Sequence, residues 1–140
     1  MPIEIIMQPE ILFRGVTQEG FDRLIHPDRQ NEYIDVGRYT IRWLDALGYA
    51  LEYAVTYGSK ARMILLHDPS KYKHKKTSEE VFEIKEPIRL DDPDTTILTE
   101  EKNLGDLCAY ENEGVIMTRE QVNEYAAEVR EKLKRSKGRQ

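Results

Sequence analysis

The sequence predicts one domain of the α+β class. Its 140 residues match the size of a single ordinary domain. We assign residues 1–136 to that domain and residues 137–140 to a frayed basic tail. Two helical patterns lie between strands in the first half, several short strands follow, and a helical pattern comes last. This order, with mainly antiparallel pairing expected in the second half, is typical of the α+β class.

The composition narrows the classes of function. The chain is 39% hydrophobic and contains eight Tyr, three Phe and one Trp, which is enough material for a core. A net charge of −5 argues against a protein that binds nucleic acid through bulk charge. Cys108 is the single cysteine, which excludes an internal disulfide and a cysteine-based zinc site and fits a reducing, cytoplasmic setting. The three histidines are too scattered to predict a metal site, and no apolar run is long enough to cross a membrane.

The first third of the chain alternates strands and a helix. Ile3–Met7 and Ile11–Val16 have the composition of short strands. Thr17 is a candidate N-cap for a helix over Gln18–Ile25. Tyr33–Trp43 is rich in β-branched and aromatic residues, which predicts one or two strands.

A second helix and a buried strand come next. Asp45 is a candidate cap for a helix over Ala46–Tyr57, which Gly58 ends. Apolar residues recur along one face of this segment, as in a helix packed on a core. Arg62–His67 is a short apolar run and predicts a buried strand.

The second half predicts a loop, three strands and a final helix. Lys71–Lys76 reads KYKHKK and is predicted to be a solvated loop. Thr118 is expected to cap the last helix, with Gln121 completing a capping box. Short apolar or alternating runs predict strands over Glu80–Ile84, Leu107–Tyr110 and Gly114–Met117.

The first candidate site segment is a cation followed by a glycine at the end of an apolar strand. Arg14 must find a partner or a ligand there, because an unpaired buried charge is costly. Gly15 allows another group to approach the backbone closely. The alternative is an edge-strand arginine that pairs with a surface acid.

The second segment carries a row of tyrosines after an aromatic residue and an acid. Trp43 and Asp45 precede Tyr49, Tyr53 and Tyr57, which are spaced four apart and share a helix face. These rings suit a platform for a flat ligand. The alternative is a set of core residues whose hydroxyls reach the surface.

The third segment holds two carboxylates two residues apart. Glu111 and Glu113 would point to the same side of a strand. In a cleft, one can polarise a substrate hydroxyl while the other orients a nucleophile. The alternative is a solvated start of a strand.

Together, these three segments resemble the ADP-ribosyltransferase superfamily. Phe13-Arg14-Gly15 is similar to its first motif in the arginine form, and Arg42–Tyr53 is similar to a strand, Asp and helix element of the poly(ADP-ribose) polymerase branch. Tyr39-Thr40 is the nearest match to the hydroxyl motif of the central strand. Glu111-Asn112-Glu113 resembles the segment with the catalytic glutamate of arginine-modifying members.

The resemblance implies split antiparallel β-sheets with flanking helices, and NAD as the substrate in a cleft. Glu113 would be the catalytic residue that stabilises an oxocarbenium-like state through the ribose 2′-hydroxyl, and Glu111 would orient the acceptor. Arg14 would bind a phosphate or ribose, and Tyr53 would stack on nicotinamide. The residues that the resemblance assigns to NAD binding are Arg14, Gly15, Thr40, Trp43, Tyr49 and Tyr53.

The expected activity is therefore transfer of ADP-ribose from NAD to a macromolecular acceptor, or hydrolysis of NAD. We expect a protein acceptor, with nucleic acid left open through Lys71–Lys76. An enzyme of this kind suits a toxin or effector. Two alternatives stay open: a non-catalytic module on the same fold that binds NAD, a related nucleotide or a protein, and an unrelated α+β interaction protein.

Overall fold

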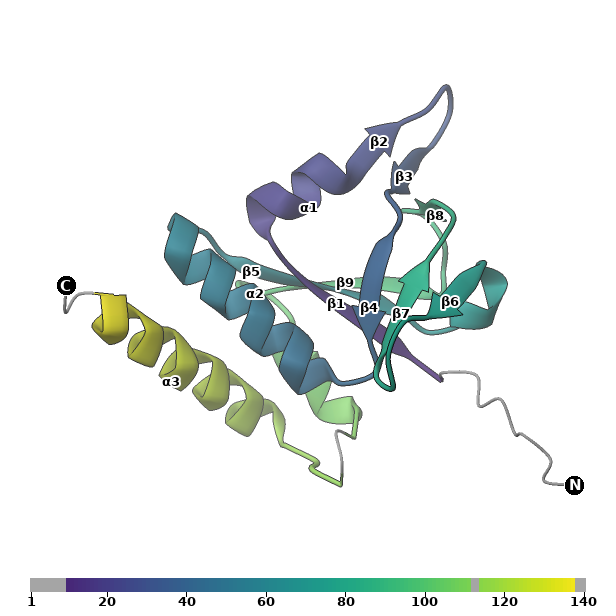
Figure 1. Cartoon of the computed structure of the whole chain (residues 1–140). Coiled ribbons are helices and arrows are strands. Elements are labelled where there is room, and N and C mark those ends of the chain that lie inside the picture. Colours follow the sequence, from purple (N-terminus) through teal and green to yellow (C-terminus); the bar gives the residue numbers. More distant parts are fainter. Residues whose placement is uncertain (1–9, 112–113, 138–140) are drawn as a thin grey trace, which may run out of the picture.

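The computed structural model describes residues 10–111 and 114–137 and confirms the α+β class. Its larger sheet is antiparallel throughout and has the strand order β6-β7-β4-β1-β5-β9 (Figure 1). In that order the strands are β6 (His74–Lys76), β7 (Val81–Ile84), β4 (Gly37–Thr40), β1 (Leu12–Thr17), β5 (Ala61–Leu66) and β9 (Thr95–Thr99). The smaller sheet consists of β2 (Ile25–Pro27), β3 (Glu32–Ile34) and β8 (Ile88–Arg89).

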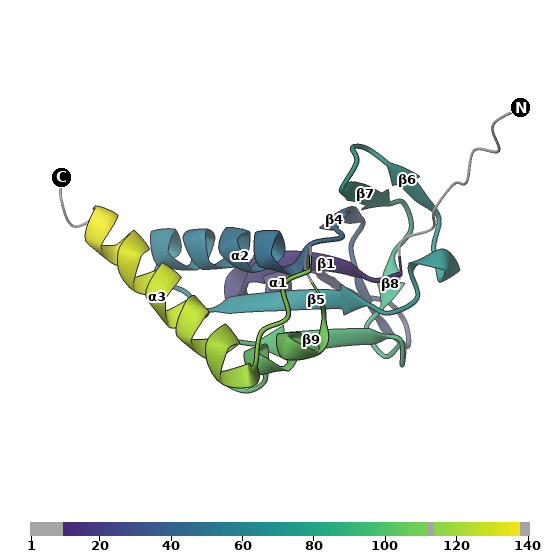
Figure 2. The same ribbon diagram turned by 90° about the horizontal axis from the view of Figure 1, so that it is seen from below.

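The two longest of the described helices pack side by side, and shorter helices lie elsewhere in the chain. The α-helices within the described residues are α1 (Gln18–Leu24), α2 (Trp43–Tyr57) and α3 (Arg119–Lys137). Two short 3-10 helices, η1 (Pro69–Lys71) and η2 (Leu104–Ala109), lie in connections. In both ribbon views α3 lies beside α2, and the two helices pack against each other (Figure 2).

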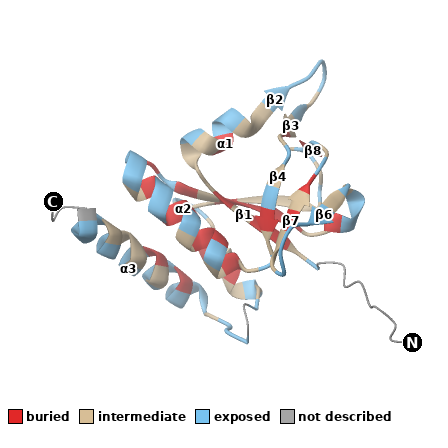
Figure 3. Ribbon diagram, in the orientation of Figure 1, coloured by how far each residue is buried: buried red, intermediate tan, exposed pale blue. Residues whose placement is uncertain are grey.

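The larger sheet separates two hydrophobic cores. The first core lies under α2, α3 and η2 and includes Phe13, Trp43 and Leu51. The second includes Tyr39 and Ile84 and takes contributions from α1 and the smaller sheet. β1 alternates between the two cores, and five of the six residues of β5 are buried, because both faces of this strand are covered. Figure 3 shows the same pattern, with buried residues concentrated on β1 and on the inner side of α2.

Local capping signals set several helix ends as predicted. The Thr17 hydroxyl accepts a hydrogen bond from the backbone N–H of Gly20, 3.0 Å away, at the start of α1. Gly58 ends α2 in the left-handed conformation with φ of 64°, which favours glycine. Thr118 and Gln121 form the expected capping box of α3, because each side chain accepts from the other residue's backbone N–H.

Other boundaries depart from the sequence predictions. Helix α2 begins at Trp43 rather than after a cap at Asp45, because the Trp43 side chain is drawn into the first core. Leu107–Tyr110 is not a strand, because Leu107–Ala109 belongs to the 3-10 helix η2, which buries Leu107 in the first core. Thr95–Thr99 forms the edge strand β9, which the sequence analysis did not predict. The predicted strand at Ile3–Met7 lies outside the described residues.

One weak seam in the larger sheet positions the site. Strand β1 pairs with β5 along its whole length, from Leu12 opposite Leu66 to Thr17 opposite Ala61. In the described chain, its pairing with β4 is confined to Phe13 opposite Thr40. Beyond that pair the two strands separate, and α1 lies across the opening (Figure 1).

Candidate functional site

A cavity of about 1380 Å³ opens where β1 and β4 separate. Its walls come from β1, α1, β4, α2 and the beginning of β7. Five residues that were assigned to NAD binding in the sequence line it together: Arg14, Gly15, Thr40, Tyr49 and Tyr53. The two ends of this set are 39 positions apart in the chain, so the fold, not local sequence, brings them together. A cavity of this size is roomy for a drug-sized ligand, whose pockets measure about 300–1,000 Å³.

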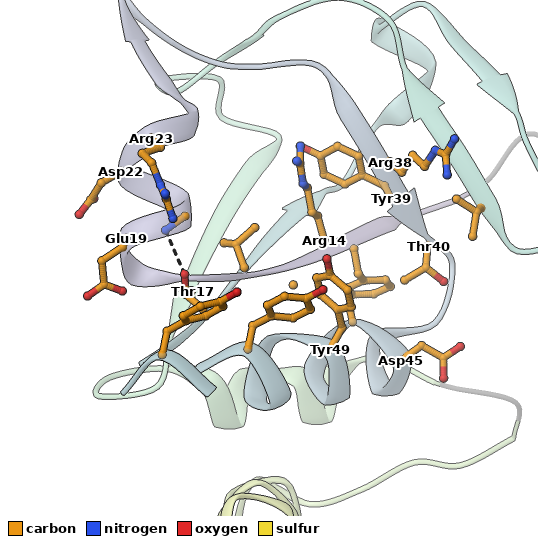
Figure 4. A pocket seen from close by; sticks show the side chains of 18 of the residues that line it. Arg14, Thr17, Glu19, Asp22, Arg23, Arg38, Tyr39, Thr40, Asp45 and Tyr49 are labelled. Carbon is orange, nitrogen blue, oxygen red and sulfur yellow. Dashed lines mark hydrogen bonds between the residues drawn. The ribbon is translucent and has the colours of Figure 1, made fainter. Parts of the chain in front are cut away.

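The floor of the cavity is formed by a pair of buried polar side chains. Because Phe13 lies opposite Thr40 in an antiparallel pair, Arg14 and Tyr39 are neighbours on the same face. The Arg14 guanidinium carbon lies 5.6 Å from the centre of the Tyr39 ring, and Figure 4 shows its charged end beside the Tyr39 hydroxyl. Among the described residues, neither Arg14 Nη1 nor the Tyr39 hydroxyl has a hydrogen-bond partner, although both atoms are buried. A buried donor without a hydrogen-bond partner lowers the stability of the fold by about 1–3 kcal/mol.

Burial also raises the pKa of the Tyr39 phenol. The Tyr39 side chain is 1% exposed, and its burial raises the pKa to about 12, an effect that the nearby Arg14 charge partly opposes. Like an ordinary phenol, the Tyr39 hydroxyl carries its proton at neutral pH. Gly37 leaves the space for this arrangement, since a Cβ at that position would lie 2.1 Å from Arg14 Nη1.

Two of the predicted residues have structural duties as well as a place in the cavity wall. Gly15 lets α2 approach β1, because a Cβ there would lie 1.9 Å from the carbonyl oxygen of Ala46. The Thr40 hydroxyl accepts a hydrogen bond from the backbone N–H of Arg42 at 3.2 Å, in the turn that leads into α2. Thr40 therefore shapes the entry to the helix that carries the tyrosines.

The three tyrosines of α2 form an exposed ladder rather than core. The ring centres of Tyr49 and Tyr53 are 4.6 Å apart, and those of Tyr53 and Tyr57 are 6.1 Å apart with nearly parallel planes. Their exposed fractions are 55%, 40% and 71%, and all three line the cavity. The Tyr53 hydroxyl beside it, and then burial, raise the pKa of Tyr49. The ladder thus presents aromatic surface for a flat ring, the ligand-platform interpretation of this segment.

Charges of both signs surround the tyrosine ladder. Arg23 on α1 and Arg38 on β4 line the cavity. Acidic groups line it as well, and these are Glu19, Asp22, Asp45 and Glu80. Glu19 accepts a short hydrogen bond from the Ser59 hydroxyl, which lowers the pKa of its carboxyl. Glu80 forms an ion pair with Arg42, with nitrogen and oxygen 2.5 Å apart.

Trp43 does not line the cavity, although it was assigned to NAD binding. Its side chain is fully buried in the first core, and its Nε1 donates a hydrogen bond to the carbonyl of Tyr110 at 2.9 Å. This hydrogen bond attaches Tyr110, the residue before Glu111, to the first residue of α2. Glu111 is exposed and is not one of the described cavity-lining residues, and Glu113 lies outside the described residues.

The basic segment Lys71–Lys76 is not the loop that was predicted. It contains the end of η1 and the strand β6, because residues 74–76 pair with β7. The Lys71 ammonium lies 2.8 Å from carboxylate oxygens of both Asp92 and Asp94. These ion pairs raise the pKa of Lys71 and neutralise its charge within the molecule.

Tyr39 and Arg38 are among the cavity-lining residues that had not been assigned to binding from the sequence. The signal for Tyr39 was available in principle, because it adjoins Thr40 and alternates with it along a predicted strand. Its pairing with Arg14 depends on the strand register, which the sequence does not reveal.

Comparisons with protein-family models, curated proteins and solved structures gave no significant match to this chain. Within residues 10–111 and 114–137, no helix has the length and apolar character needed to cross a membrane. The same residues contain no group of three or more His, Cys, Asp or Glu side chains placed to hold a metal ion.

Proposed function

We propose that this protein is an NAD-dependent ADP-ribosyltransferase that transfers ADP-ribose to a macromolecular acceptor or to water. One observation carries the proposal: five of the six residues assigned to NAD binding from the sequence line a single cavity. That cavity lies between two parts of an antiparallel sheet and is flanked by α1 and α2. This arrangement agrees with the split sheets and flanking helices that the family resemblance implies.

The cavity-lining residues suit the parts of a dinucleotide. Arg14 Nη1 is buried without a hydrogen-bond partner among the described residues, and arginine matches the geometry of phosphate. Tyr49 and Tyr53 offer exposed ring faces on which nicotinamide can stack. The cavity volume of about 1380 Å³ accommodates a ligand larger than a typical drug.

The proposed chemistry needs a carboxylate near the tyrosine ladder. Glu113 would accept a hydrogen bond from the ribose 2′-hydroxyl while the bond between the ribose C1′ and the nicotinamide nitrogen breaks. Nicotinamide leaves with the electron pair of that bond, and the acceptor attacks C1′ and loses a proton. Glu111 would orient the acceptor. The bond from Trp43 to the Tyr110 carbonyl holds the approach to this segment at the start of α2, fewer than two helical turns before Tyr49.

A second candidate function is a non-catalytic module that binds a nucleotide in the same cavity. The observation in its favour is the placement of Glu111, the catalytic candidate within the described residues, outside the described cavity lining. Both candidates share a cytoplasmic setting and a macromolecular partner, for which we favour a protein over nucleic acid. They differ in whether the glycosidic bond of NAD breaks.

Nicotinamide release from NAD separates the two functions. We would measure it for the wild type and for Glu113→Gln, with and without a cell lysate as a source of acceptor. Glu101→Gln is the matched control, because Glu101 is an exposed acid in the turn after β9, away from the cavity. We expect release by the wild type and the control, and a fall of at least about 100-fold in Glu113→Gln, the loss that follows removal of one electrostatic stabiliser.

The remaining outcomes decide the alternatives. Stimulation by lysate indicates a macromolecular acceptor, whereas equal release without lysate indicates NAD hydrolysis. If no variant releases nicotinamide but NAD raises the melting temperature, the protein is the binding module. Absence of both release and a melting shift contradicts both functions.

A further inference from the structure

The floor of the cavity holds two hydrogen-bond donors with no acceptor among the described residues. These are Nη1 of Arg14 and the hydroxyl of Tyr39. A guanidinium can only donate, so Arg14 cannot accept the phenol proton of Tyr39 even where the two groups approach each other. The Tyr39 side chain is 1% exposed and is one of the residues that line the cavity, so its unpartnered hydroxyl belongs to the buried wall of that cavity.

An anionic oxygen would satisfy both of these donors. Adjacent donors, one of them permanently charged, attract a group that only accepts, and phosphate offers several acceptor oxygens. Arg38 adds another cation to the same wall. The tyrosine ladder on α2 forms the opposite side of the cavity in Figure 4, and it offers stacking surface for a base.

We propose that Tyr39 is a specificity-determining residue whose hydroxyl, together with Arg14, binds a phosphate group of a nucleotide. Tyr39 then distinguishes a phosphorylated nucleotide from its nucleoside. This inference concerns the cavity of the proposed function and rests on that function only for the identity of the nucleotide. A transferase and a non-catalytic module would both use Tyr39 in this way.

Binding of four probes to the full chain tests the role of Tyr39. Isothermal titration calorimetry would use ADP, adenosine, pyrophosphate and inorganic phosphate. For the wild type we expect ADP and pyrophosphate to bind and adenosine to bind at least about tenfold more weakly than ADP. Tyr39→Phe should lower the affinity for ADP and for pyrophosphate by about tenfold or more, because it removes a hydrogen bond to a charged group. The affinity for adenosine should not change.

Two further variants separate this role from a structural one. Tyr125→Phe is the matched control, because Tyr125 is a half-buried tyrosine on α3 that packs against the first core and does not line the cavity. It should bind every probe as the wild type does. Gly37→Ala keeps Tyr39 but places a Cβ 2.1 Å from Arg14 Nη1. It should therefore displace the guanidinium and also lower the affinity for ADP.

The melting temperature of Tyr39→Phe shows whether the Tyr39 hydroxyl serves the fold or the ligand. A hydroxyl that serves the fold would lower the melting temperature when removed, whereas an unpartnered buried hydroxyl can be removed with no loss or a gain. We therefore expect a melting temperature at or above that of the wild type. A lowered melting temperature together with unchanged ADP affinity would make Tyr39 structural and overturn the proposal.

The other outcomes are equally decisive. Equal affinity for adenosine and ADP, or no binding of ADP and pyrophosphate at millimolar concentration, overturns the phosphate site. Inorganic phosphate that binds as tightly as ADP overturns its assignment to a nucleotide. Tyr39-dependent ADP binding without nicotinamide release leaves this inference standing while the transferase fails. If nicotinamide release depends on Glu113 but Tyr39→Phe keeps full affinity for ADP, the transferase stands and the inference about Tyr39 fails.

Discussion

Gly15 and Gly48 differ in how much space surrounds them. Gly15 packs against α2, whereas Gly48 is part of α2. Gly15 on β1 has the carbonyl of Ala46 directly over its Cα, with 1.9 Å between that oxygen and a Cβ built on the glycine. Gly48 lies within α2, and a Cβ there meets nothing within 4 Å. The same substitution should therefore have opposite effects at the two positions.

We predict that Gly15→Ala lowers the free energy of unfolding by about 2 kcal/mol or more, because α2 must move away from β1. Gly48→Ala should raise it by about 0.5–1 kcal/mol, since alanine has the higher helix propensity. Urea unfolding of the two variants beside the wild type measures both changes. A neutral Gly15→Ala would mean that β1 and α2 do not pack as closely as this structure has them.

Five of the six residues that the family resemblance assigned to NAD binding share one cavity, and their role in binding stays a prediction. Residue patterns alone indicated two parts of this set, a charge on an apolar strand at Arg14 and tyrosines four apart on a helix at Tyr49 and Tyr53. Trp43 could not be placed from the sequence. An aromatic residue at the end of a strand suits a site and a core equally, and here a hydrogen bond to Tyr110, 67 positions away, holds it in the core.

At the scale of elements, signals confined to a few neighbouring residues predicted the structure well. The caps at Thr17, Gly58 and Thr118 depend on the local backbone and are present as expected. Strands β6 and β9 were missed. β6 exists because it pairs with β7, and its basic sequence carries no strand pattern. β9 pairs with β5, and its sequence TTILT is rich in β-branched residues, a strand signal that the sequence prediction left unused.

The connection after β5 is held by a charged cluster, which predicts a response to acid. Burial alone would raise the pKa of Asp92, but hydrogen bonds from Lys71 and from the Tyr72 hydroxyl overcome it and lower the pKa to about 2, from 3.8. Because the folded-state pKa is depressed, Asp92 contributes its stabilisation in full above the unfolded value near 3.8. That contribution is lost as the pH falls from about 4 to about 2.

We predict that Asp92→Asn lowers the free energy of unfolding at pH 7 and reduces its fall between pH 4 and pH 2. Urea unfolding midpoints at intervals across that range measure both effects. Asp91→Asn is the matched control, because Asp91 is an exposed acid whose pair with Arg89 lies at the surface, and it should follow the wild type. Parallel pH profiles for Asp92→Asn and the wild type would contradict the role of the cluster.

At the scale of the whole molecule, one sheet supports two cores, and the candidate site lies at the seam of that sheet. Strand β1 carries Phe13 into the first core and Leu12 into the second, and next to them it carries Arg14 into the cavity. The site thus depends on both cores, because a shift of β4 or of α2 relative to β1 would separate Arg14 from Tyr39 or from the tyrosine ladder. Residues 1–136 should then unfold as one unit, which remains a prediction.

Trp43 provides the probe for this last prediction, because it is the single tryptophan and is fully buried in the first core. Leu51→Ala in the first core and Ile84→Ala in the second each delete fully buried groups and should cost about 2–5 kcal/mol. If the chain is one domain, both variants lower the urea midpoint reported by Trp43 fluorescence, and far-UV circular dichroism gives the same midpoint for each. If Ile84→Ala leaves the Trp43 transition unchanged while circular dichroism detects an earlier phase, the two cores unfold separately. A site formed at their seam would then be complete only when both are folded, so ligand binding would have to couple the two units.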